Sequence, residues 1–198
     1  MKNYYDIYIV GVGGQGILTI ADIITLTAAK KGIDVNYYPT KGMAQRGGFV
    51  KAQLRIGRSA DTFGPSIPKG GADLIVSMEL SETLKAIRYA KKGADFVVLG
   101  THWEPTAVML GKAPYPEEEI VIDEIKKAGG MVSFLSPANV PEYARENLYT
   151  LGAIFAHSKL SGIFTQEEIE QVIEERWPSV AEGNLKGFRA GLEAVVIN

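Results

Sequence analysis

The chain has 198 residues, of which 46% are hydrophobic and 22% charged, and its formal net charge is −2. This length and balance suit one compact globular domain with a sizeable core. A charge so close to neutral, without any lysine- or arginine-rich block, provides no electrostatic footprint for nucleic acid.

The absence of cysteine excludes a disulfide, a thiolate-bound zinc ion and an iron–sulfur cluster ligated by this chain. Two histidines leave little for a histidine-based site, and we predict no metal site. The N-terminus lacks a signal-peptide pattern, and no apolar run approaches the ~20 residues that span a bilayer. We therefore expect a cytoplasmic protein that binds neither membrane nor nucleic acid.

The N-terminal segments predict a βαβ unit. Residues 5–10, "YDIYIV", are apolar, β-branched and aromatic, as in a buried strand. Residues 17–32 have a helical period, with Gly32 as its stop, and residues 34–38 read as a second strand. A strand, a glycine turn, a helix and a strand in this order are typical of a βαβ unit whose first turn faces a ligand.

Residues 49–57, "FVKAQLRIG", alternate strictly between apolar and polar side chains. The polar set is Lys51, Gln53 and Arg55. Because fully buried parallel strands do not alternate, we expect this polar face to be wet or to meet a polar partner. Residues 59–71 are rich in Gly, Pro and Ser and predict a loop.

The remaining chain alternates strands and helices and then becomes helical. We expect strands at 72–80, 94–102 and 131–136, helices at 81–93 and 116–130, and an irregular excursion at 103–116. Three helical segments follow at 140–160, 165–177 and 181–196, the second with a Thr165–Glu168 capping box. The predicted fold is α/β: a single domain, 1–198, with a doubly wound, mostly parallel, Rossmann-like sheet and a helical C-terminal part from about residue 138.

The stretch "IVGVGGQGIL" places Gly11, Gly13, Gly14 and Gly16 between the first strand and the first helix. Their spacing fits the dinucleotide fingerprint, but the acidic residue expected at the end of the second strand is missing from 36–39, "NYYP". A tight turn accounts for Gly11 and Gly16. Gly13 and Gly14 instead expose backbone N–H groups suited to an anion. We predict a ligand-facing loop and keep an NAD(P)-dependent oxidoreductase as an alternative.

A second loop, "TKGMAQRGG" at 40–48, leaves the second strand and should reach the same carboxyl edge of the sheet. It carries Lys41, Gln45 and Arg46, and ends in the pair Gly47 and Gly48. The simple interpretation is an exposed turn on which the charged side chains of Lys41 and Arg46 are solvated. The paired glycines, which allow close backbone approach, favour two loops that converge on one crevice.

Two further residues are candidates for a role in the crevice or in an interface. Glu79 ends a predicted strand and either lines the crevice or caps the following helix. Trp103 is a candidate interface anchor, because tryptophan is enriched in protein–protein interfaces.

The two loops together, "GVGGQGIL" and "KGMAQRGG", resemble the gamma-type subunit of 2-oxoacid:ferredoxin oxidoreductases, most closely the indolepyruvate-type members. The segments "ENLYTLGAIFAHSKL" and "GNLKGFRAG" are similar to C-terminal segments of that family. The resemblance covers nearly the whole chain. It implies one domain of the pyruvate/ketoisovalerate oxidoreductase gamma type.

The resemblance implies a subunit of a hetero-oligomeric enzyme that oxidatively decarboxylates a 2-oxoacid to an acyl-CoA and reduces ferredoxin. Thiamine diphosphate and [4Fe–4S] clusters would lie in partner subunits, and this chain would contribute to the coenzyme A and substrate side. It would hold no catalytic residue and would be inactive alone. The identity of the 2-oxoacid stays open, and a non-catalytic docking module is a further alternative.

By the same resemblance, the glycine loop presents donors to an anionic or carbonyl group, while Lys41 and Arg46 supply charge for coenzyme A phosphates or the substrate carboxylate. Gln45 would orient the ligand. The predicted binding residues are Gly11, Gly13, Gly14, Gln15, Gly16, Lys41, Gln45, Arg46, Gly47 and Gly48.

Overall fold

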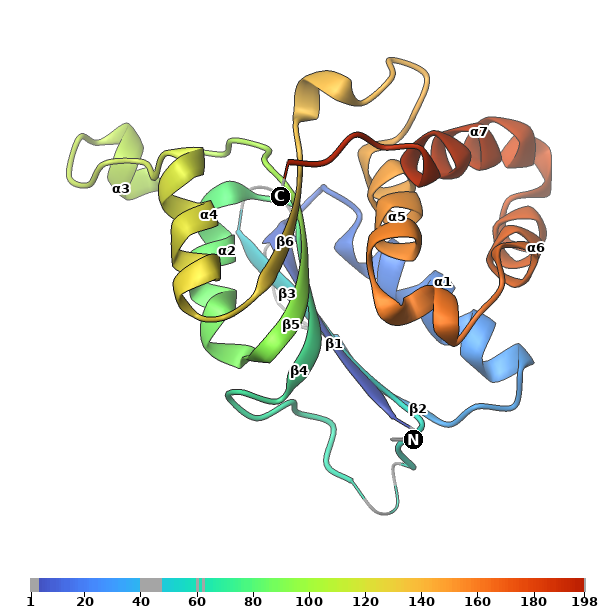
Figure 1. Ribbon diagram of the computed structural model, residues 1–198. Coiled ribbons are helices and arrows are strands. Elements are labelled where there is room, and N and C mark those ends of the chain that lie inside the picture. The colour runs from blue at the N-terminus through green and yellow to red at the C-terminus, as the bar shows by residue number, and fades with distance from the viewer. Residues whose placement is uncertain (1–3, 40–47, 60, 62, 198) are drawn as a thin grey trace.

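The computed structural model describes residues 4–39, 48–59, 61 and 63–197. A six-stranded sheet with the order β2-β3-β1-β4-β5-β6 forms the centre of the molecule (Figure 1). Its strands are β1 (Tyr5–Val12), β2 (Val35–Pro39), β3 (Phe49–Ile56), β4 (Ala72–Ser77), β5 (Ala90–Leu99) and β6 (Met131–Leu135). The strands β1, β4, β5 and β6 pair in parallel, whereas β3 is antiparallel to both of its neighbours.

Helices cover both faces of the sheet, with α2 and α4 on one side and α1, α5, α6 and α7 on the other (Figure 1). The helices are α1 (Ile17–Lys30), α2 (Leu80–Ala86), α3 (Thr106–Met109), α4 (Glu118–Lys127), α5 (Glu146–His157), α6 (Gln166–Arg176) and α7 (Ala181–Leu192). Within the described residues, no helix has the length and apolar character that a bilayer crossing requires. The expected α/β fold with a mostly parallel sheet and a helical C-terminal part is confirmed.

Two hydrophobic cores lie on opposite faces of the sheet because successive strand residues point to opposite sides. Ile7 and Ile9 of β1 belong to the core under α1 and α5, whereas Tyr8 and Val10 belong to the core under α2 and α4. All four side chains are at most 2% exposed. Residues of β1 are therefore buried on both faces, as the apolar sequence of this strand predicts.

The strand order differs from a simple βαβ unit. β1 and β2 run in the same direction, but β3 lies between them and pairs with both. The chain therefore turns back after β2 and inserts an antiparallel strand beside β1. Its register pairs Phe49 with Val12, so β3 begins at the carboxyl edge where β1 ends.

Two of the three side chains on the polar face of β3 are buried, and the third, Lys51, is half-buried. Gln53 and Arg55 are only 2% and 8% exposed, because the loop after β3 folds back over them. The Gln53 carboxamide accepts a hydrogen bond from the Ile67 N–H at 2.7 Å. Arg55 and Arg58 donate to the buried Asp6 carboxylate at 3.0 to 3.2 Å. The polar partners of this strand therefore come from the same chain, which an alternating pattern alone does not reveal.

The expected helix at 81–93 is too long. α2 ends at Ala86, a single 3₁₀ turn covers Ile87–Tyr89, and β5 begins at Ala90. Gly93 has a φ of +78° inside this strand, next to a shift of register between β4 and β5. The glycine thus marks an irregularity of the strand rather than a helix end. The Thr165–Glu168 capping box is present as predicted.

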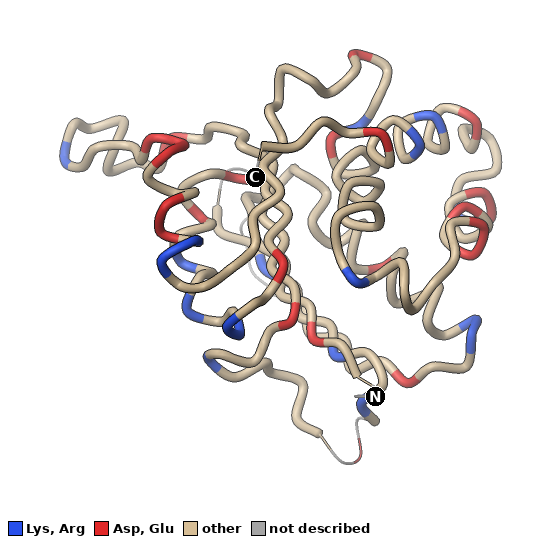
Figure 2. The backbone as a smooth tube through the Cα atoms, viewed as in Figure 1, with Lys and Arg blue, Asp and Glu red and all other residues tan. Residues whose placement is uncertain are grey.

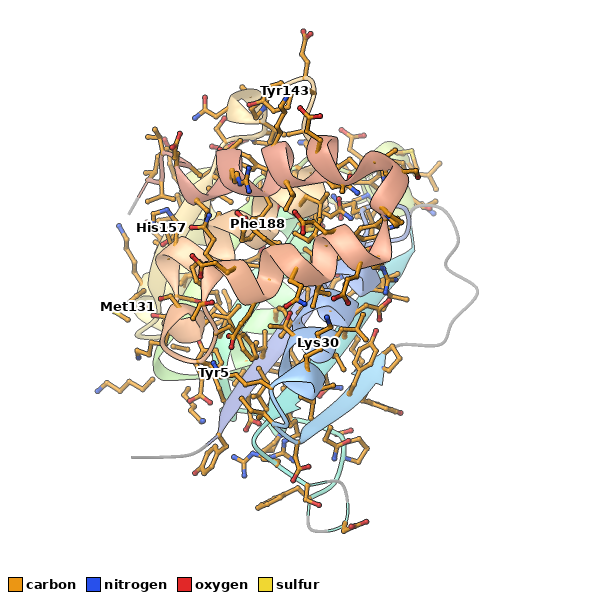
Figure 3. All side chains as sticks on the ribbon, turned by 90° about the vertical axis from the view of Figure 1, so that its right-hand side faces the viewer. Tyr5, Lys30, Met131, Tyr143, His157 and Phe188 are labelled. Atoms are coloured by element: carbon orange, nitrogen blue, oxygen red, sulfur yellow. The ribbon has the colours of Figure 1, made fainter. Side chains whose placement is uncertain are left out.

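The helices α5 and α7 touch along their backbones at two glycines. A Cβ atom on Gly152 would overlap the Phe188 carbonyl oxygen, and one on Gly191 would overlap the Tyr149 carbonyl oxygen. Phe188, labelled in Figure 3, is fully buried. This close crossing fixes the position of α5 relative to α7, and hence the place where α5 begins.

We expect Gly152→Ala to lower the free energy of unfolding by about 3 kcal/mol, because a methyl group cannot enter the α5–α7 contact without separating the helices. Gly183→Ala, at an exposed position of α7 with open space around it, is the matched control. It should raise stability by up to about 1 kcal/mol through helix propensity. Urea denaturation followed by circular dichroism measures both. Equal effects of the two substitutions would contradict the close crossing.

Candidate functional site

The loop between β1 and α1 lies at the carboxyl edge of the sheet. Gly14 and Gly16 have φ angles of +105° and +78°, a region that L side chains rarely adopt. Gly16 precedes the first turn of α1 and offers no side-chain cap to it. The N–H groups of Gly14 and Gly16 make no hydrogen bond to any other described residue. Among the described residues, nothing occupies these groups at the start of α1, a position suited to an anion.

The side-chain amide of Gln15 forms two hydrogen bonds within the chain. Its side-chain Oε1 accepts a hydrogen bond from the Val12 N–H at 2.9 Å. Its Nε2 donates to the carbonyl oxygen of Met78, just after β4. The amide therefore joins the ends of two adjacent strands and holds the loop in shape. Sequence alone could not give the direction of this side chain.

The two glycine loops meet at the described end of the second one. The Gly13 N–H donates to the Gly48 carbonyl oxygen at 2.8 Å. Gly11 has a structural role, because a Cβ atom there would overlap Ile17 and Gln15 side-chain atoms. The other predicted residues of the second loop, Lys41, Gln45, Arg46 and Gly47, lie outside the described residues.

The start of α5 lies opposite the glycine loop. A pocket of about 400 Å³ lies between the glycine loop and this helix, lined by Gly14, Gln15, Gly16, Thr19, Arg145, Glu146 and Asn147. A Cβ atom on Gly16 would overlap the Asn147 side chain. Gly16 therefore permits both the turn and the close approach of α5. The N-termini of α1 and α5 face the same pocket.

Sequence reasoning missed Arg145. The helical pattern was expected from residue 140, which would place Arg145 inside the helix; in the structure α5 begins one residue later, at Glu146. Arg145 is thus the residue before the helix, exposed at the rim of the pocket. The acidic residue directly after it, favourable in a first helical turn, is the sequence signal that marks this start.

The electrostatics of the pocket favour an anion. Two helix N-termini and Arg145 line it, and a guanidinium can bind a phosphate or carboxylate with two hydrogen bonds. Glu146 opposes this charge, and its burial raises the pKa of its carboxyl group. Among its described lining residues the pocket has no histidine and no lysine. The arrangement is suited to binding and orienting an anionic group.

Glu79 caps a helix, one of its two predicted roles. Its side chain is fully buried and accepts hydrogen bonds from the N–H of Glu82 at 2.8 Å and the hydroxyl of Ser81 at 2.8 Å. It also accepts from the Trp103 N–H at 3.3 Å and from the Tyr115 hydroxyl. Glu79 therefore fixes α2 and the segment after β5 to the end of β4.

The strand order is unfavourable for a dinucleotide. The acidic residue of that fingerprint stands at the end of the strand beside β1. Here the position beside β1 is taken by β3, which begins next to Gly48, and the end of β2 at Pro39 is one strand further out. The missing acidic residue and the inserted strand β3 thus both depart from the dinucleotide-binding arrangement.

Comparison with known proteins supports the resemblance seen in the two loops. The family described as pyruvate ferredoxin/flavodoxin oxidoreductase matches residues 6–194. Indolepyruvate oxidoreductase subunit IorB from Archaeoglobus fulgidus is 34% identical over 196 residues, covering 96% of this chain and 95% of the relative.

Solved structures show the same fold. Pyruvate oxidoreductase subunit PORC from Thermotoga maritima superposes with a TM-score of 0.69 at 22% identity, covering 99% of this chain and 98% of that one. The 2-oxoglutarate:ferredoxin oxidoreductase from Magnetococcus marinus, solved with 2-oxoglutarate, coenzyme A and succinyl-CoA, has a TM-score of 0.67 at 20% identity. The match covers 98% of this chain but 31% of that one. The chain belongs to the pyruvate ferredoxin/flavodoxin oxidoreductase family.

Proposed function

We propose that this chain is the gamma-type subunit of a 2-oxoacid:ferredoxin oxidoreductase and contributes to the coenzyme A and substrate side of its active site. The pocket between the glycine loop and the start of α5 is the observation that carries this proposal. Family membership supplies the reaction class, and the pocket supplies the binding chemistry. The resemblance to IorB favours indolepyruvate or a similar aromatic 2-oxoacid as the substrate.

In the proposed reaction, the 2-oxoacid loses CO₂, its acyl carbon is oxidised and bonded to the sulfur of coenzyme A, and two electrons pass to ferredoxin. Thiamine diphosphate would supply the carbanion chemistry and iron–sulfur clusters the electron path. A chain without cysteine has no thiolate for such a cluster. We therefore assign the clusters to cytoplasmic partner subunits. The family resemblance assigns thiamine diphosphate to them as well, and leaves binding and orientation to this chain.

The pocket fits the phosphate-bearing part of coenzyme A. Backbone N–H groups at two helix N-termini and one guanidinium complement a phosphate. A volume of about 400 Å³ is at the small end of the range for ligand pockets, so most of the coenzyme would contact the partner. Lys41 and Arg46, from the second loop, would add positive charge.

We expect Arg145→Ala to raise the KM for coenzyme A about tenfold in the reconstituted complex, the equivalent of about 1.4 kcal/mol of binding. The KM for the 2-oxoacid should stay unchanged, because the guanidinium meets a phosphate. Arg88→Ala, an exposed position just after α2, is the control. Steady-state kinetics with varied coenzyme A measures the effect. An unchanged KM would remove Arg145 from the site.

Arg46→Ala tests the second loop in the same assay. We expect a higher KM for coenzyme A or for the 2-oxoacid, and the substrate that responds identifies the anion Arg46 binds. If the variant subunit assembles normally with its partner but the complex loses turnover, Arg46 acts in binding and not only in docking.

The free-standing dehydrogenase is tested separately. Tight binding of NADH by the isolated chain, measured by fluorescence, would support that alternative.

The affinity for coenzyme A should fall as the pH rises. Burial already raises the pKa of Glu146, and an anion beside it disfavours the carboxylate further. Binding therefore takes up a proton, and affinity is lost as the pH rises through the pKa of Glu146. Glu146→Gln should bind more tightly at high pH and lose this dependence. Calorimetry of the complex in buffers of different ionisation enthalpy measures the proton uptake. The titration of coenzyme A itself contributes equally to the wild type and to the Glu146→Gln variant, so the difference between them reports on Glu146. Identical pH profiles would contradict the proposal.

A further inference from the structure

The segment between β5 and α4 extends from the body of the molecule, and we call residues 103–114 the arm (Figure 1). It contains the short helix α3. Three of its large apolar side chains are exposed: Trp103 at 47%, Met109 at 63% and Leu110 at 62%. Large apolar groups on an ordered projection are unfavourable in water unless another surface covers them.

The arm is an ordered element. The N–H groups of Met109 and Leu110 donate to the carbonyls of Pro105 and Thr106 at 3.1 and 3.0 Å, and the Lys112 N–H closes the next turn. Its base is fixed as well, because Glu79 binds the Trp103 N–H and the Tyr115 hydroxyl. The arm therefore presents its apolar side chains in a defined arrangement.

The arm and the glycine loop share one edge of the sheet. The arm follows the end of β5, and the glycine loop follows the end of the parallel strand β1. A short path joins them: Gln15 donates to the Met78 carbonyl, and the next residue, Glu79, binds the base of the arm. A subunit that covers this edge from the pocket across to the α2–α4 side of the sheet would also reach the arm.

The charges around the arm indicate what it fits. The arm itself carries one acidic and one basic side chain, the exposed Glu104 and Lys112, and Glu117, Glu118 and Glu119 stand exposed where the chain returns to α4. Figure 2 shows the acidic start of α4 beside the arm. A matching surface would have an apolar groove with a basic rim.

We propose that the arm inserts into an apolar, basic-rimmed groove on the catalytic partner subunit. This inference rests on the proposed function. A symmetric contact with a second copy would bring together the three glutamates that stand beside each arm, which is unfavourable. In the Magnetococcus marinus enzyme this fold matches 31% of a longer chain, which fits a fold that works against further domains of the same enzyme.

The test is the double variant Met109→Ser/Leu110→Ser. It should weaken binding to the purified catalytic subunit of the same organism by about 30-fold or more, as for central apolar contacts of an interface. The melting temperature of the variant should match that of the wild type, because both side chains are exposed. Val195→Ser, at an aliphatic position 73% exposed and outside the arm, is the control and should bind normally.

Biolayer interferometry measures the affinities, and light scattering the mass of the isolated chain. Normal binding by the double variant would overturn the proposal that the arm docks on the partner. The coenzyme A proposal would still be tested by its own kinetic experiment. A wild-type dimer that becomes monomeric in the variant would instead assign the arm to a second copy and overturn the proposal. A wild type that does not bind the catalytic subunit would overturn both proposals.

Discussion

The side chain of Gln15 controls the shape of the glycine loop. Its amide accepts from the Val12 N–H and donates to the Met78 carbonyl, and so bridges the ends of β1 and β4. With this side chain turned inward, the exposed part of the loop is backbone. A loop fixed in this way loses little entropy when a ligand binds, so its N–H groups are ready to act as donors. The loop therefore depends on one internal amide rather than on glycine alone.

The opposite wall of the pocket depends on a packing constraint far from it. Gly152 and Gly191 let α5 and α7 touch along their backbones, which sets the line along which α5 runs. At its N-terminus, the same helix approaches Gly16 so closely that Asn147 would overlap a Cβ atom there. Gly152 in the middle of α5 and Gly16 before α1 thus allow the start of one helix to lie against the start of the other. The partial positive charges at the N-termini of α1 and α5 therefore act on the same pocket.

Much of the fold follows from local sequence patterns. The helix α1, the Thr165–Glu168 capping box and the glycine loop after β1 all appear where the sequence predicts them. These features depend on neighbours within a few residues, which a single sequence displays. The meeting of the two loops follows from strand direction, and the Gly13–Gly48 hydrogen bond agrees with it.

The parts that were missed depend on distant contacts. The strand β3 looks half-wet in sequence, yet Arg55 is buried because Asp6 and a later loop supply its partners. Arg145 looked like a helix interior because apolar residues continue upstream of the true start of α5. Arg55 acquires its role from segments that pair with it only in three dimensions, and no local period records that pairing. Arg145 lines the pocket only because α5 is brought against the glycine loop, although Glu146 marks the start of the helix locally.

The arm and the glycine loop are connected through one turn of the chain. Glu79 is buried and accepts a hydrogen bond from the Trp103 N–H, and the carbonyl of its neighbour Met78 accepts one from the Gln15 amide. Two adjacent residues just after β4 therefore hold both the base of the arm and the loop. Because these bonds lie within the chain itself, both elements are fixed before a partner docks, and assembly of the proposed complex would bring the partner to a preformed anion site.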